Sequence, residues 1–303
     1  PDVICHNATS MNHLETFETA RKTNVDGVTE ILRIIACGRP KALNYVSTLS
    51  VFSMVGHEGA RRVDEFTSIE LERHTSTNGY ASSKWVGEQL VQLAMQRGLP
   101  CNVYRLGLIT GDAELGRYDE QQTFHRLLES CIRIGAGFEK SNYDLLATPV
   151  DYVARALVRL GNDHSRGGSV FHLSSMNITP IETIFALYNQ VAQPPLAILS
   201  YREWLDRIRE RSVAGEVLPI LPLLHSILNI DDSMLETFMV EHERVTLRFD
   251  CTHTQSKLEQ AGIVMPPFNA YLMSTYLQGM LLANPELNTL IKAVYTPSDC
   301  VSG

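Results

Sequence analysis

Three apolar runs alternate with two helical patterns over the first 110 residues, and this order constrains the fold more than any other feature of the chain. The runs lie at 3–8, 42–46 and 101–109, and they are largely continuous rather than alternating. Helical patterns at 24–36 and 80–97 separate them. Continuous apolar strands joined through helices are typical of a parallel sheet with both faces covered. We therefore predict an α/β fold with right-handed crossovers.

Helical patterns predominate in the rest of the chain. The polar stretch Met54–Gly79 predicts a loop. The pattern predicts a strand at 170–173, mixed helical structure over 194–263, and helices at 121–134, 150–160, 181–193 and 269–282. Thr179 is expected to cap the third of these helices, with Pro180 in its first turn. The boundary between the sheet region and the helical region is expected near 110–180.

Composition excludes several classes of protein. The 303 residues include 26 basic and 34 acidic side chains, a net charge of −8, and no long basic run, which argues against a broad nucleic-acid footprint. Six cysteines without CxxC and ten histidines without HExxH predict neither a metal site nor a disulfide framework. We expect reduced thiols and a cytoplasmic protein. The sequence contains no run of 18 apolar residues, so it predicts no membrane span.

The segment Tyr80-Ala-Ser-Ser-Lys84 carries the strongest chemical signal. Tyr and Lys four residues apart share one face of a helix. A protonated lysine beside a phenol stabilises the phenolate, so we expect a lowered pKa for Tyr80 and a role as proton donor to a carbonyl oxygen. Thr48 follows a strand and is placed to bond the same oxygen. Taken alone, Tyr80 and Lys84 have an alternative explanation as a surface pair. Their position after a strand that ends in Val-Ser-Thr is a more specific signal of a reductase site.

With these residues in view, the chain resembles an extended short-chain dehydrogenase/reductase. It is most similar to the thioester reductase branch, which comprises the terminal reductase domains of nonribosomal peptide and polyketide synthases and those of carboxylic acid reductases. The resemblance runs over nearly the whole chain. It rests on HNAT at 6–9, NVDGVTEILR at 24–33, NYVSTLSVF at 44–52, GYASSKWVGEQLV at 79–91, YRLGLITGD at 104–112, TPVDYVARAL at 148–157 and VFHLSS at 170–175.

The resemblance implies a fold, a reaction and partners. The fold would be a Rossmann-like doubly wound sheet, with an NADP-binding domain at 1–175 and a mainly helical substrate and carrier-binding subdomain at 176–303, to which 110–150 contribute. The reaction would be NADPH-dependent release of a carrier-protein-bound acyl or peptidyl thioester as an aldehyde, with further reduction to the alcohol left open. The partner would be a phosphopantetheinyl carrier protein, and the chain a monomeric domain of a larger megasynthase.

The resemblance also assigns site residues. Thr48, Tyr80 and Lys84 would be catalytic, and Lys84 would also bond the nicotinamide ribose. The cofactor would lie along Asn7, Ala8, Thr9, Asn24, Ser47, Tyr80, Lys84, Leu106, Gly107, Leu108 and Ile109. Asn24 matches a family residue that supports the neighbouring strands, and a helix N-cap is its equally favoured alternative.

One part of the family pattern is missing. The family opens with a strand and a GxxGxxG turn that receives the cofactor pyrophosphate at a helix N-terminus. Neither this turn nor the basic residue that selects NADP is found in the sequence. We expect an N-terminal segment outside this chain to complete the sheet, and we expect weak NADPH binding without it.

Alternative functions stay open on the sequence alone. A redox-silent relative would release its chain by Dieckmann-type cyclisation, and another reductase of the family would act on acyl-CoA or a small carbonyl compound. A non-catalytic nucleotide-sensing module on the same fold is the third alternative. The intact set Thr48, Tyr80 and Lys84 favours reduction.

Other features have plainer explanations. The arginines between 202 and 211 form either a docking face for an acidic carrier or a solvated helix face, and the second is favoured. Val217–Ile230 would line an acyl tunnel, form a hydrophobic lid or, more simply, form core. Arg105 is expected to pair with a carboxylate and Asp151 to cap a helix. His6, His125 and His172 are expected to be core or loop residues without a catalytic role.

Overall fold

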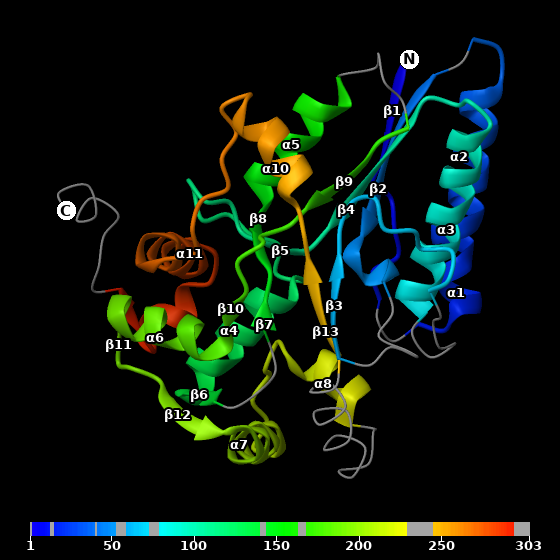
Figure 1. Cartoon of the computed structure of the whole chain (residues 1–303). Coiled ribbons are helices and arrows are strands. Elements are labelled where there is room, and N and C mark those ends of the chain that lie inside the picture. Colours follow the sequence, from blue (N-terminus) through cyan, green and yellow to red (C-terminus); the bar gives the residue numbers. More distant parts are fainter. Residues whose placement is uncertain are drawn as a thin grey trace. The chain divides into compact units, whose positions relative to one another are not determined.

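The computed structural model describes residues 2–12, 15–39, 41–52, 59–72, 79–139, 144–162, 168–228 and 245–293. The chain forms two compact units (Figure 1). The first unit comprises Pro1–Gly107, Val153–Met176 and Glu243–Val264, and the second comprises Leu108–Tyr152, Asn177–His242 and Met265–Gly303. The expected functional division into 1–175 and 176–303 stays a prediction. The compact units are discontinuous in sequence, and residues 243–264 belong to the first.

A parallel sheet forms the centre of the first unit. Its four strands have the order β1-β2-β4-β9. They are β1 (Val3–His6), β2 (Ala42–Thr48), β4 (Cys101–Leu106) and β9 (Val170–Leu173), and every neighbouring pair is parallel. The predicted α/β fold with a parallel sheet is confirmed. The apolar run at 101–109 ends as a strand at Leu106, and a separate short strand begins at Leu108 in the second unit.

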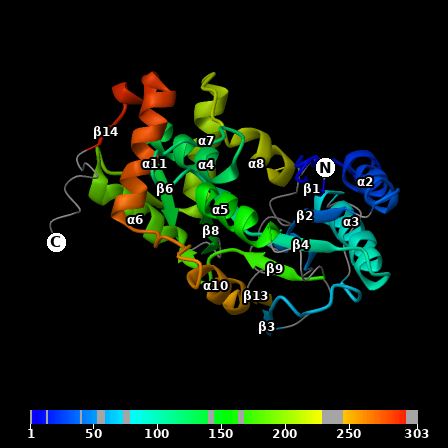
Figure 2. The same ribbon diagram turned by 90° about the horizontal axis from the view of Figure 1, so that it is seen from above.

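Two helices lie side by side against this sheet (Figure 2). They are α2 (Gly27–Ala36) and α3 (Gly79–Gln96). The helix predicted from residue 24 begins earlier, because α1 (Phe17–Arg21) and a π-helical turn, Lys22–Asp26, continue directly into α2. The apolar stripes of the helices and the buried face of the sheet form one core, which contains Val28, Ile35, Leu43, Tyr45, Val91, Ala94, Cys101 and Val103.

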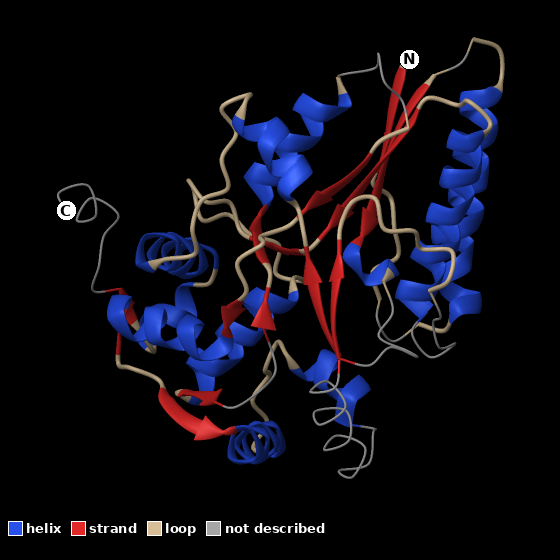
Figure 3. Cartoon of the chain, in the orientation of Figure 1, coloured by secondary structure: helices blue, strands red, loops and turns tan. Residues whose placement is uncertain are grey.

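A second parallel pair of strands in this unit was not expected from the sequence. It consists of β3 (Gly59–Val63) and β13 (Val245–Phe249), and it appears as two adjacent arrows in Figure 3. The predicted loop over 54–79 is therefore wrong at 59–63. The pair packs against Phe52, whose ring lies 6.1 Å from that of Phe249. The polar residues of β3 give no apolar strand pattern, because ion pairs satisfy their charges. Arg61 pairs with Glu72, and Arg62 pairs with Asp250.

Two helices complete the first unit. They are α5 (Val150–Gly161), which begins in the second unit, and α10 (Thr252–Glu259). The amide of Asn44 on β2 donates to the carbonyl of Gly161 at 3.3 Å, which anchors the end of α5. Thr254 of α10 accepts from the backbone N–H of His172 on β9 at 3.1 Å.

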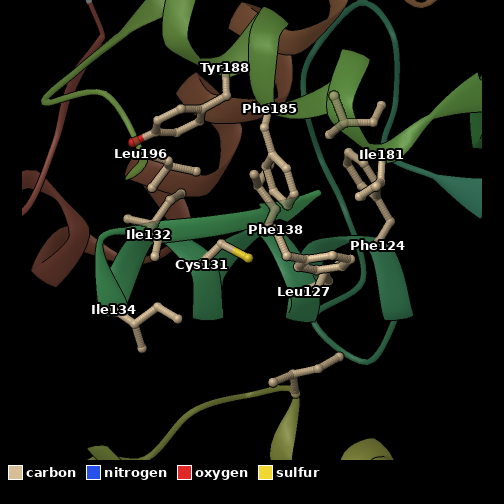
Figure 4. Close-up of a cluster of buried hydrophobic side chains, with 14 of the residues drawn as sticks. Phe124, Leu127, Cys131, Ile132, Ile134, Phe138, Ile181, Phe185, Tyr188 and Leu196 are labelled. Atoms are coloured by element: carbon tan, nitrogen blue, oxygen red, sulfur yellow. The ribbon is translucent and has the colours of Figure 1, made fainter. Parts of the chain in front are cut away.

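The second unit is mainly helical and has its own core. Its longer helices are α4 (Thr123–Ile134), α6 (Ile181–Val191), α7 (Tyr201–Val213), α8 (Leu221–Leu228) and α11 (Ala270–Ala283). Its short strands pair as β5 (Leu108–Thr110) with β8 (Ala147–Pro149), β6 (Ala136–Glu139) with β12 (Ala197–Ser200), β7 (Asp144–Leu145) with β10 (Thr179–Pro180), and β11 (Ala192–Gln193) with β14 (Lys292–Ala293). Figure 4 shows Phe138 and Phe185 meeting at the centre of this core.

Two local expectations in this unit change. Thr179 does not cap α6, because it lies in β10 and the N-cap position is Pro180, which has no side-chain cap bond. The apolar run from Val217 places Leu218, Ile220 and Leu224 in the main core cluster, whereas Val217 itself is exposed. Residues 229 and 230 of that run lie outside the described residues.

The described residues bear on three expectations from composition, which concern cysteines, metal sites and membrane spans. Their five cysteines are free thiols, while Cys300 lies outside them. In the same part of the chain, acidic, histidine and cysteine side chains do not gather into any group that could hold a metal ion. The described helices are all too short or too polar to cross a bilayer.

We expect opposite effects on stability from alanine at two helical glycines of the first unit. At Gly27 a new Cβ meets nothing within 4 Å, so Gly27→Ala should raise the free energy of unfolding by about 0.5–1 kcal/mol. At Gly87 the same atom would lie 2.7 Å from the carbonyl of Asn24 and 2.8 Å from the hydroxyl of Tyr45, so Gly87→Ala should lower it by about 1–3 kcal/mol. Urea unfolding of both variants measures the difference. Equal effects would contradict the tight contact between α3 and its neighbours.

Candidate functional site

The structure brings the hydroxyls of Thr48 and Tyr80 together. Thr48 is the last residue of β2, at the carboxyl end of a central strand, and Tyr80 lies in the first turn of α3. Their side chains are hydrogen-bonded, and Thr48 also accepts from the backbone N–H of Ser50 at 3.2 Å. Two hydroxyl donors therefore meet at the edge where open parallel sheets bind their ligands.

Lys84 is buried one helical turn beyond Tyr80. It is 3% exposed, and its Nζ donates to the carbonyl of Val46 at 2.7 Å. Burial lowers its pKa from 10.5 to about 8, while the nearby carboxylate of Glu88 opposes this shift. An ammonium has three donors, and the bond to Val46 uses one of them. This side chain can therefore still serve other acceptors.

The pKa of Tyr80 moves in the direction opposite to the sequence expectation. Burial raises it above 10, and the hydrogen bond with Thr48 offsets only part of that change. The spacing of Tyr80 and Lys84 led us to expect a lowered value, but desolvation of the phenol dominates in the folded chain. At neutral pH the phenol is thus protonated and holds a proton to give.

A buried ion pair lies beneath these residues. Glu88 and Arg105 are 0% and 1% exposed, and the Glu88 carboxylate accepts from Arg105 Nε at 3.0 Å and from Nη2 at 2.8 Å. Ser47 donates to the same carboxylate at 2.5 Å, and Gln92 donates at 2.8 Å. The predicted pairing of Arg105 with a carboxylate is confirmed. Glu88 itself was missed, although its place four residues after Lys84 put it on the same helix face.

Asn24 links the loop after β1 to the helix that carries Tyr80. Its amide oxygen accepts from Thr9 Oγ1 at 2.9 Å and from the Ser10 N–H at 2.7 Å, and its amide nitrogen donates to Ser83 Oγ at 2.9 Å. Ser83 in turn donates to the carbonyl of Tyr80 at 2.9 Å. Asn24 lies inside the π-helical turn and not at the N-cap of α2. The N-cap alternative is therefore wrong, and the side chain of Asn24 bonds the loop after β1 and α3.

The remaining expected cofactor residues belong to the first unit, except for Leu108 and Ile109, which belong to the second. Asn7 and Ala8 are exposed after β1, Thr9 is held by Asn24, and Ser47 is held by Glu88. Leu106 ends β4, and Gly107 donates its N–H to the carbonyl of Leu173 at 3.2 Å. Leu108 and Ile109 belong to β5 of the second unit. The carboxyl ends of β1 and β2 thus carry exposed residues and hydroxyls, and α3 brings the ammonium of Lys84 to β2. This donor set suits the polar groups of a nicotinamide nucleotide.

The other predicted side chains have structural partners. Asp151 lies within α5 and accepts from the N–H of Ala113 at 2.9 Å, so it does not cap the helix at its start. On α7, Arg209 pairs with Asp206 and Arg211 pairs with Glu216, as a solvated helix face would. His125 and His172 are buried, and burial lowers the pKa of each to about 3.

The chain matches a known protein family over the half that carries this site. The model of the male sterility protein family, which is named as NAD-binding, matches residues 1–157 of the 303. The chain belongs to this family. It is also similar to a solved structure, the terminal R domain from the myxalamid PKS-NRPS biosynthetic pathway, with 31% identity, a TM-score of 0.78, and coverage of 93% of this chain and 68% of that one. The predicted membership among terminal reductase domains, and with it an oxidoreductase family with a nicotinamide cofactor, is confirmed.

Curated relatives agree with this assignment. The chain is 33% identical to a linear gramicidin synthase protein of Brevibacillus parabrevis over 69% of this chain and 4% of that protein. It is 27% identical to the non-canonical nonribosomal peptide synthetase FrzA of a Cladobotryum species and to the aldehyde reductase lnaA of Aspergillus flavus. Each of these two matches covers 91% of this chain and 27% of the relative. The chain thus spans about a quarter of the length of these two relatives.

We expect the buried pair to govern stability. Glu88→Gln leaves the Arg105 guanidinium buried without its counter-charge and should lower the free energy of unfolding by about 3–5 kcal/mol. The matched control is Glu30→Gln, which removes an exposed ion pair with Arg33 and should cost less than about 1 kcal/mol. Chemical denaturation of both variants tests this. A loss for Glu88→Gln as small as that of the control would contradict the role given to the pair.

Proposed function

We propose that this chain is the reductase domain that releases an acyl or peptidyl thioester from a carrier protein as an aldehyde, with NADPH as the reductant. The observation that carries the proposal is the hydrogen-bonded pair of Thr48 and Tyr80 beside the buried ammonium of Lys84. One relative is named a nonribosomal peptide synthetase, another a linear gramicidin synthase, and a third an aldehyde reductase. The first two names support a place in nonribosomal peptide synthesis, and the third supports the reduction of a carbonyl group.

The residues divide the work at the carbonyl oxygen. Bound NADPH would supply hydride to the carbonyl carbon. Thr48 and Tyr80 would donate hydrogen bonds to the oxygen as negative charge develops there, and Tyr80 would transfer its proton. The raised pKa of Tyr80 favours this direction, because the phenol is protonated before the reaction begins. Collapse of the hemithioacetal would then free the carrier thiol and the aldehyde.

Binding of the cofactor would use the carboxyl ends of the strands. Lys84 would donate to the ribose hydroxyls, and Asn7, Ala8 and Thr9 would lie along the nucleotide, with Ser47, Leu106, Gly107, Leu108 and Ile109 near the nicotinamide. Asn24 would hold the Thr9–Ser10 loop in place for this contact. The partner would be a carrier protein with a phosphopantetheine arm.

The proton-donor role of Tyr80 can be tested by one atom. Tyr80→Phe removes the hydroxyl and keeps the ring, so we expect kcat to fall by about 10²–10⁴-fold while the Kd of NADPH changes little. Stopped-flow NADPH oxidation with a carrier-bound acyl thioester measures the first, and fluorescence titration measures the second. Unchanged turnover in Tyr80→Phe would refute the assignment, and chain release without NADPH oxidation would favour the Dieckmann alternative.

The pH profile should show the charge of Lys84. Its pKa is lowered to about 8, so the ammonium is present below that value and is lost as pH rises through it. The pKa of Tyr80 lies above 10. We therefore expect kcat/KM to fall above about pH 8 with a single proton loss. In Lys84→Arg, which stays charged, any residual activity should lack this limb. A limb near pH 8 that persists in Lys84→Arg would contradict the assignment.

A further inference from the structure

The ammonium of Lys84 lies over an aromatic ring. Its Nζ is 4.4 Å from the centroid of the Tyr45 ring on β2. Tyr45 is 0% exposed and Lys84 is 3% exposed, so both partners are removed from water. A cation within about 6 Å of a ring face is attracted by the electron density of the ring, and the attraction strengthens when water is excluded. This contact was not anticipated from the sequence.

The hydroxyl of Tyr45 does not explain why a tyrosine ring occupies this position. Its oxygen is buried and has no hydrogen-bond partner in the described part of the chain. A buried hydroxyl without a partner costs free energy. The helix makes room for this hydroxyl at Gly87, where a Cβ would lie 2.8 Å from the oxygen. The favourable contacts of Tyr45 are therefore those of its ring.

We propose that Tyr45 is a positioning residue for Lys84, whose ring face holds the ammonium at the carbonyl of Val46 and keeps it charged in a site that excludes water. The consequence for catalysis rests on the proposed function. The charge state of Lys84 can be measured without it, so the two proposals can fail separately.

The other titratable groups that face Lys84 are either neutral or engaged with other partners. Glu88 on α3 favours the ammonium, but its carboxylate is engaged by Arg105 and Ser47. His6 on β1 stacks on Tyr45 with ring centroids 5.9 Å apart, and burial and Lys84 together lower its pKa, so it is neutral at neutral pH. Tyr80 is likewise neutral there. The ring face of Tyr45 is thus an attraction for the ammonium that is separate from the Glu88–Arg105 ion pair.

A series of ring-fluorinated phenylalanines at position 45 tests the proposal at nearly constant shape. Fluorine withdraws electron density from the ring face, so the ammonium loses its attraction while the packing is kept. We expect Tyr45→Phe to keep the pKa of Lys84 near its wild-type value, and increasing fluorination to lower it by about one unit in total. The measurement is the pH titration of the Lys84 Cε resonance in protein labelled with [13Cε]lysine, assigned with Lys84→Arg.

A neighbouring tyrosine supplies the matched control. Tyr104 is also 0% exposed, on the adjacent strand β4, but its ring stacks on Phe171 at 5.3 Å. The same fluorinated series at position 104 should leave the pKa of Lys84 unchanged. An equal shift from both positions, or no shift from position 45, would overturn the positioning role.

The same variants separate the two proposals. A graded fall of the Lys84 pKa that moves the high-pH limb of kcat/KM by the same amount supports both. A graded fall in a protein that never reduces a carrier-bound thioester supports the positioning role and refutes the proposed function. If the protein reduces the thioester, but fluorination at position 45 changes neither the high-pH limb of kcat/KM nor the pKa of Lys84, the positioning role alone is refuted.

Discussion

The buried pair of Glu88 and Arg105 fixes the helix of the candidate site against the sheet. Removing two charges from water is costly, and the cost is offset only where further hydrogen bonds satisfy both groups. Here Ser47 and Gln92 donate further hydrogen bonds to the carboxylate of Glu88. The pair therefore joins α3 to β4, and Ser47 ties in the end of β2. Thr48 follows Ser47 directly, and Lys84 precedes Glu88 by one helical turn, so the position of both depends on this contact.

Burial acts on the two titrating groups of the site in chemically different ways. It raises the pKa of Tyr80 and lowers that of Lys84, because it disfavours the charged form of each. For a proton donor, the neutral phenol is the useful form, so burial assists Tyr80. For an ammonium, burial is adverse. The ammonium of Lys84 accordingly has a carbonyl, an aromatic ring and a nearby carboxylate around it.

Apolar periodicity predicted the central sheet and its two helices, because burial of strands and helix stripes leaves a direct mark on residue order. It did not predict β3, whose Arg61 and Arg62 reach partners outside the strand and leave a polar pattern. The spacing of Tyr80 and Lys84 predicted that the site exists, but not the direction of the Tyr80 pKa. That direction depends on how deeply the fold buries the phenol, and no local pattern records it.

The strand pair β3 and β13 has a consequence for how the chain is assembled. Residues 59–63 find their hydrogen-bonding partner only at 245–249, and the backbone of His172 finds Thr254, so three separated stretches of sequence make one compact body. During synthesis the ribosome must deliver residues 108–152 and 177–242 of the second unit before the first unit has all of its strands. A fragment cut after Met176 would keep the central strands yet expose Phe52 and Val63, and this favours association between copies over independent folding.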